Sequence, residues 1–109
     1  MRLIIAGGRD YELTEDDYLW LDEIPDVTHV IEGGAKGADR GGRLWAIYRG
    51  LPYHTEPADW ENYGNAAGPR RNRKMAEMAD ALAVFPGGRG SASMKKIALE
   101  MGLKVYERT

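Results

Sequence analysis

Short apolar segments alternate with segments of helical periodicity along the chain. Leu3 to Ala6 is a continuous apolar run, which is typical of a strand that is covered on both faces of a sheet. Further strands are predicted over Val27 to Ile31, Leu51 to Thr55, Ala81 to Phe85 and Leu103 to Tyr106. The pattern therefore predicts five strands.

Helices are predicted between these strands, because apolar residues recur there three or four positions apart. The first should begin near Thr14, whose hydroxyl can cap the following amides. The second follows Asp39 and ends at Gly50. The third begins at Gly68, with a proline in its first turn, and the fourth covers Ser91 to Met101.

The segment from Glu56 to Ala67 has no clear period and contains Pro57 and Gly64, so we expect a long loop. Long loops in small domains are often functional. Two interpretations are open for Trp60 and Tyr63 in this segment. Their rings either stack on a base or ribose, or pin the loop to the core.

The regular alternation of strand and helix predicts the fold class. It indicates a single Rossmann-like α/β domain over residues 1–109, with a mainly parallel five-stranded sheet and helices on both faces. The expected strand order is 3-2-1-4-5. Ligands of such sheets bind beyond the carboxyl ends of the strands, where the order reverses, and here the first and fourth strands flank that point.

Glycine-rich turns follow three of the predicted strands, at residues 7–10, 33–39 and 86–93. Because these strands are neighbours in the expected sheet, the three turns should converge. Glycine lets a ligand approach the backbone, and a helix that starts just beyond it offers unpaired N–H groups to an anion. The turns match neither a P-loop nor a Gly-x-Gly-x-x-Gly fingerprint, so we expect a phosphate-bearing ligand without Walker-type ATPase chemistry or ordinary NAD binding.

Arginines crowd the start of the third predicted helix, at Arg70, Arg71 and Arg73. Cations at the amino end of a helix oppose its dipole, so their position favours an anionic partner, and the alternative is a solvated helix face. Together with the glycine turns they define the expected site. The residues predicted to bind the ligand are Gly7, Gly8, Arg9, Gly33, Gly34, Ala35, Lys36, Gly37, Ala38, Asp39, Arg70, Asn72, Arg73, Gly87, Gly88, Arg89, Gly90, Ser91 and Ser93.

Composition narrows the function classes. The net charge of -2 argues against general attachment to nucleic acid or to a membrane surface, and the chain has no cysteine for a disulfide or a thiolate metal site. His29 and His54 lie in predicted strands, the first of them buried, without metal-ligand spacing. We expect a cytoplasmic protein with no metal or cofactor, and a homodimer or higher homo-oligomer by analogy with relatives of this fold.

The chain resembles the SLOG superfamily at these loops. The matching segments are Ile5 to Asp10, Glu32 to Asp39, Pro57 to Trp60, Ala67 to Arg73 and Phe85 to Ser91. This Rossmann-like superfamily includes the DNA-processing protein DprA and the LOG phosphoribohydrolases, and the chain is most similar to its small YspA-like branch. The resemblance implies a site for nucleotides or nucleotide-derived signals.

The resemblance leaves three functions open. In the first, the domain senses or sequesters a nucleotide-derived signal, as proposed for SLOG domains in bacterial and phage conflict. In the second, it is a LOG-like hydrolase that cleaves the N-glycosidic bond of a nucleoside monophosphate such as AMP. The third is single-stranded DNA binding in the manner of DprA through Arg70 to Lys74, against which the net acidity counts.

The hydrolase function requires a carboxylate near the anomeric carbon. LOG enzymes supply a glutamate shortly after a Pro-Gly-Gly-x-Gly-Thr motif and an arginine on the preceding helix. Arg73 matches that arginine, whereas no glutamate follows Ser91. Asp10, Asp39 or Asp59 would have to replace it, and Asp39 is equally well explained as a helix cap.

Overall fold

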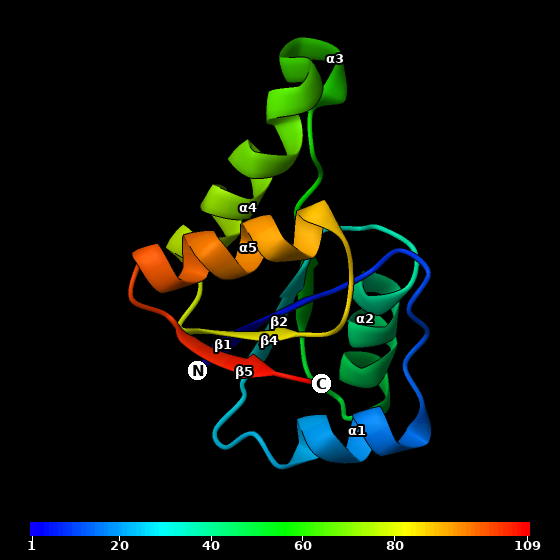
Figure 1. Cartoon of the computed structure of the whole chain (residues 1–109). Coiled ribbons are helices and arrows are strands. Elements are labelled where there is room, and N and C mark those ends of the chain that lie inside the picture. Colours follow the sequence, from blue (N-terminus) through cyan, green and yellow to red (C-terminus); the bar gives the residue numbers. More distant parts are fainter.

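The structure is a computed structural model that describes residues 1–109, and a five-stranded sheet forms its centre (Figure 1). The strands are β1 (Arg2–Ala6), β2 (His29–Glu32), β3 (Tyr53–Thr55), β4 (Ala81–Val84) and β5 (Lys104–Glu107). All neighbours pair in parallel, in the order β3-β2-β1-β4-β5. The predicted fold class and strand order are confirmed.

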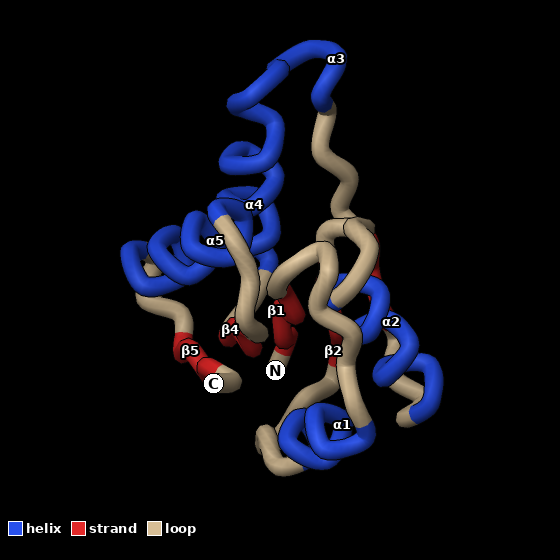
Figure 2. The backbone as a smooth tube through the Cα atoms, turned by 45° about the vertical axis from the view of Figure 1, so that its right-hand side comes forward, coloured by secondary structure: helices blue, strands red, loops and turns tan.

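Helices cover both faces of this sheet, as Figure 2 shows. On one side lie α1 (Glu15–Asp22) and α2 (Ala38–Tyr48). On the other lie α4 (Ala67–Met78) and α5 (Arg89–Glu100), which pack against each other. A chain that alternates parallel strands with helices can cover both faces in this way only through crossover connections.

The alternation of side chains along β1 divides the core into two layers. Leu3 and Ile5 belong to a buried cluster on the α1 and α2 side that includes Trp45. Ile4 belongs to a second buried cluster on the α4 and α5 side that includes Met75. Because both faces of β1 are buried, the strand is apolar at every position from 3 to 6.

Helix α1 begins with the cap that the sequence predicts. Thr14 Oγ1 accepts a hydrogen bond from the Asp17 amide, and Asp17 Oδ2 accepts one from the Thr14 amide. Asp17 is buried and also accepts hydrogen bonds from Tyr11 Oη and Arg108 Nε. Burial acts to raise the pKa of Asp17, but these hydrogen bonds prevail and hold it below its ordinary value.

The segment from Glu56 to Ala67 is more regular than its sequence predicts. It contains the short helix α3 (Trp60–Tyr63) and the 3₁₀ turn η1 (Gly64–Ala66), which lead directly into α4. Asp59 starts α3, because its side chain accepts a hydrogen bond from the Asn62 amide. In Figure 1 these turns rise beyond the sheet and carry the start of α4 away from it.

Two details of the strands also differ from the predictions. The side chain of His29 is exposed, not buried, and its Nδ1 lies 3.0 Å from Thr28 Oγ1. Strand β3 begins at Tyr53, because the Leu51 amide instead donates to the Ala46 carbonyl at the end of α2. No helix combines the length and apolar character needed to cross a membrane.

Candidate functional site

A cleft of about 1030 Å³ opens at the carboxyl ends of the strands. We call it the main cleft. Its walls come from the turns after β1, β2, β3 and β4, from α4 and from the start of α5, and its volume is at the upper end of the usual range for small-molecule sites. The predicted site residues that line it are Gly7, Gly8, Arg9, Asp10, Gly33, Gly34, Ala35, Asp39, Asn72, Gly88, Arg89, Gly90, Ser91 and Ser93.

The other predicted residues lie outside the lining of the main cleft, and each has another location or contact. Arg70 stacks over the Tyr63 ring at 3.9 Å, and Arg73 is exposed. Lys36 and Gly37 line a neighbouring hollow. The remaining three predicted residues outside the lining are Ala38, which is buried, Gly87, which packs closely against Gly8, and Asp59, which caps α3.

The turn before α2 and the first amide of this helix are held by contacts within the protein. The Ala38 amide donates to the Gly8 carbonyl at 3.2 Å, and the Ala35 amide donates to Asp39 Oδ2 at 3.2 Å. Gly37 has φ +74, and a Cβ on it would collide with the Gly8 carbonyl, so this glycine serves the close approach of two turns. The turn before α2 and the Ala38 amide are thus held by the protein itself, whereas the Gly37, Asp39 and Arg40 amides donate to no acceptor.

The amino end of α5 is open. The four amides from Gly88 to Ser91 donate to no acceptor in the protein, and no side chain caps the helix. A Cβ added at Gly88 or at Gly90 would meet no heavy atom within 4 Å. This helix start therefore offers unpaired N–H groups and the positive end of a helix dipole to the main cleft.

Arg71 also lines the main cleft. It belongs to the arginine cluster of α4 but is not among the residues predicted to bind the ligand. Its Nη1 donates to the Gly33 carbonyl at 2.7 Å and its Nε donates to Asn72 Oδ1 at 3.0 Å. The signal for it is helical phase, since Arg71 lies four and seven residues before Met75 and Met78, which face the core. Arg70 and Arg73 fall on other faces of α4.

Two acidic residues lie at the end of β2 and the start of α2. Glu32 is fully buried, with its carboxylate accepting hydrogen bonds from the Gly34 amide and the Thr55 hydroxyl. Asp39 lines the main cleft and is 6% exposed. Burial raises the pKa of Asp39, while the charge of Arg71 opposes the shift and that of Glu32 adds to it.

Apolar side chains form part of the cleft wall opposite these charges. Met75 of α4 and Met94 of α5 are buried and line the main cleft. Trp60 on α3 is 60% exposed, lines the cleft, and its ring lies 3.4 Å from where a Cβ of Gly68 would stand. The main cleft therefore combines an anion-binding helix end with surfaces on which a flat aromatic group can rest.

The comparisons with known proteins identify a family and a relative of this chain. The family described as the YspA, cpYpsA-related SLOG family matches residues 1–63, more than half of the chain. The chain belongs to this SLOG family. The Gene 61 protein of Mycobacterium phage D29 is 33% identical, in an alignment that spans 95% of this chain and 93% of that protein.

The SLOG match covers the first two glycine turns but ends before α4 and α5. The alignment with the phage protein extends over nearly the whole chain. Membership confirms the predicted superfamily and branch. It leaves the third turn, where the open helix end lies, to be interpreted from its own geometry.

Proposed function

We propose that this SLOG protein binds a phosphate-bearing nucleotide or nucleotide-derived signalling molecule in the main cleft, as a sensor or sequestering protein. The observation that carries the proposal is the open amino end of α5. Four consecutive amides without acceptors, at a helix start that lines a cleft, are arranged as a phosphate site. The phosphate of the ligand is assigned to Gly88 through Ser91.

The rest of the ligand is assigned to the opposite walls. The Trp60 ring is available for a base, and Arg9 and Arg89 add positive charge at the cleft without forming ion pairs within the protein. The phage-encoded relative supports extending the proposal to a role in conflict between bacteria and phages.

Isothermal titration calorimetry with AMP and with ADP-ribose tests the proposal. Native mass spectrometry of the freshly purified protein should also be examined for a retained ligand. The expected result is saturable binding that Gly88→Val abolishes, since valine would place a branched side chain where the phosphate meets the amides. Binding that is equal in the wild type and in Gly88→Val would contradict the assignment of the phosphate.

A second candidate function is hydrolysis of the N-glycosidic bond, and the buried Asp39 favours testing it. A carboxyl group with a raised pKa, in a cleft and close to an arginine, has the properties of an acid–base residue. In this candidate Asp39 assists the attack of water on the anomeric carbon. Release of free adenine from AMP, and its loss in Asp39→Asn, would establish the hydrolase, while binding without release supports the sensor.

A further inference from the structure

A second hollow of about 590 Å³ lies beside the main cleft. Arg9 and Asp10 line both, so the two spaces share one wall formed by the turn after β1. The other lining residues of the second hollow come from the segment before α1, from α1 itself, from the turn before α2 and from the first turns of α2. They are Glu12, Leu13, Tyr18, Lys36, Gly37, Arg40, Gly41 and Leu44.

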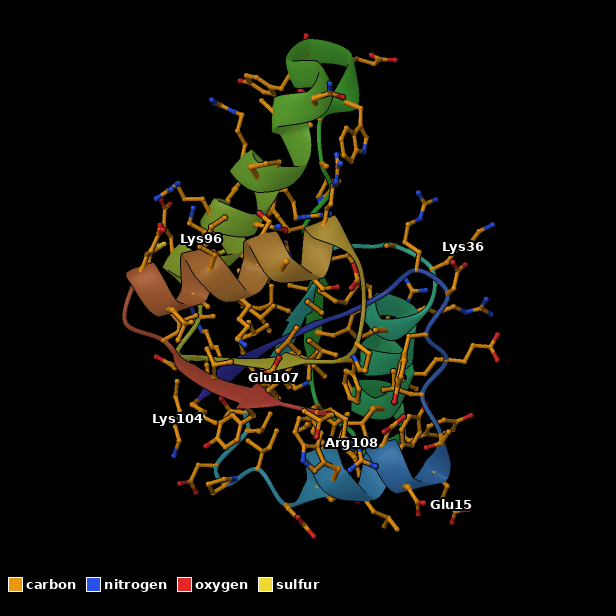
Figure 3. All side chains as sticks on the ribbon, in the orientation of Figure 1. Glu15, Lys36, Lys96, Lys104, Glu107 and Arg108 are labelled. Carbon is orange, nitrogen blue, oxygen red and sulfur yellow. The ribbon has the colours of Figure 1, made fainter.

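Three cations surround this second hollow: Arg9, Lys36 and Arg40. All three are exposed, and none forms an ion pair within the protein, not even with Asp10 or Glu12 of the same hollow. Figure 3 shows Lys36 extending outward from the turn before α2, on the side away from Lys96 and the end of α5.

These positions are unfavourable in the free protein. Lys36 and Arg40 flank the start of α2, where positive charge opposes the helix dipole. An anion in the second hollow would be attracted both by these cations and by the helix dipole.

Three of the ten residues that line the second hollow are apolar or aromatic: Leu13, Tyr18 and Leu44, all partly buried. We call the charged residues of the same lining its rim. Apolar surface beside cations matches a nucleoside phosphate, whose base prefers the apolar side chains and whose phosphate prefers the cations. The Ala38 amide is bonded to the Gly8 carbonyl, so the side chains of the three cations are assigned as the main contacts of this second phosphate.

We infer that the ligand is dinucleotide-like, with one phosphorylated nucleoside unit in the main cleft and a second in the second hollow. This inference rests on the proposed function for the first unit. The rim carries three cations and two carboxylates, a small excess suited to one further phosphate and not to a long strand. The turn of Arg9 and Asp10 lies between the two units.

The test compares AMP with the 5′-phosphorylated diadenylate pApA by calorimetry on the wild type and on two double variants. Lys36→Ala/Arg40→Ala removes two rim charges. Lys96→Ala/Lys104→Ala removes the same charge from the far side of the molecule, where both side chains are exposed and form no ion pair. Thermal melting checks that each variant is folded.

We expect pApA to bind the wild type about tenfold or more tightly than AMP, as one added charge-assisted contact would give. Lys36→Ala/Arg40→Ala should remove most of that advantage and change AMP affinity by less than about twofold, with no comparable effect in the control. Equal affinities for pApA and AMP, or equal losses for both ligands in the two double variants, would overturn the inference.

The outcomes also separate this inference from the proposed function. AMP binding that Gly88→Val abolishes, without any gain for pApA, leaves the proposed function standing and removes the dinucleotide. Wild-type protein that binds neither ligand contradicts both. Affinity for oligodeoxyadenylate that keeps rising from two to twelve nucleotides would instead assign the cations to a single strand of nucleic acid.

Discussion

Helices α2 and α5 both begin after a glycine-rich turn at the same edge of the sheet, yet their amino ends differ. Around the start of α2 the amides of Ala35 and Ala38 are bonded to Asp39 and to the Gly8 carbonyl. At α5 the amides from Gly88 to Ser91 have no acceptor. Two turns of similar composition thus differ in their contacts: the one before α2 is bonded to the turn after β1, and the one before α5 leaves all four of its amides without an acceptor.

The largest expected effect on binding comes from the open helix end. Gly88→Val should lower the affinity for AMP about 100-fold or more, because it obstructs several charge-assisted contacts at once. Gly88 has φ -94 and open space around it, so the melting temperature should stay within about 2 °C of the wild type. Calorimetry and thermal melting measure the two quantities on the same sample.

The matching change at the start of α2 is Gly37→Val, and it should lower the stability of the fold more than the affinity for AMP. Gly37→Val places a branched residue at φ +74 and against the Gly8 carbonyl, and the backbone conformation alone should lower the free energy of unfolding by about 1–3 kcal/mol. Urea denaturation measures it. A fully stable Gly37→Val protein that fails to bind AMP would reverse the contrast between the two helix ends.

Two of the three arginines of α4, Arg71 and Arg73, should also differ in whether they affect stability. Arg71→Ala removes the bonds to the Gly33 carbonyl and to Asn72, and should lower the free energy of unfolding by about 1–3 kcal/mol. Arg73→Ala should change both stability and AMP affinity by no more than about 0.5 kcal/mol, since its side chain is exposed and outside the lining of the main cleft. A tenfold loss of affinity in Arg73→Ala would favour the role that the resemblance to LOG enzymes implies.

The smallest effect concerns the pH dependence at Asp39. Because burial raises its pKa above the ordinary 3.8, the folded protein holds this proton to higher pH than the unfolded chain does. The contribution of Asp39 to stability therefore falls as pH rises from about 3.8 through the folded-state pKa. Asp39→Asn lacks this loss, so its stability relative to the wild type should improve from pH 3.5 to pH 7, as measured by urea denaturation.

A difference between Asp39→Asn and wild type that stays constant across this pH range would contradict the raised pKa. Asp17→Asn is the control, because the pKa of Asp17 is lowered and its stabilisation is lost as pH falls below the ordinary value of 3.8. Its stability relative to the wild type should thus change with pH in the opposite direction.

The sequence predicted the sheet and the location of the site better than it predicted which side chains meet there. The apolar run of β1 and the glycine turns indicate the topology and the edge of the sheet at which the main cleft opens. The roles within α4 depend on helical phase, which places Arg71 toward the cleft and leaves Arg73 outside. The short helix α3 was missed because one turn capped by Asp59 leaves no periodic pattern in the sequence.

Whether an amide is free depends on contacts between distant segments, which local sequence does not reveal. Gly8 and Ala38 are thirty residues apart, and their bond occupies the first amide of α2. Asp39 illustrates the same limit, since its acceptor role toward Ala35 is local but its burial is not. The site that the sequence predicts as three equivalent turns is therefore unequal in the folded protein.

The unpaired amides at the start of α5 also have a kinetic consequence. Amide protons without an acceptor exchange with solvent deuterium rapidly, whereas those of Ala35 and Ala38 are protected by their bonds. An anion seated on Gly88 to Ser91 would slow exchange at those positions and leave exchange at Ala35 and Ala38 almost unchanged. The rate of deuterium uptake from Gly88 to Ser91 therefore indicates whether an anion is bound there, even when the ligand has not been identified.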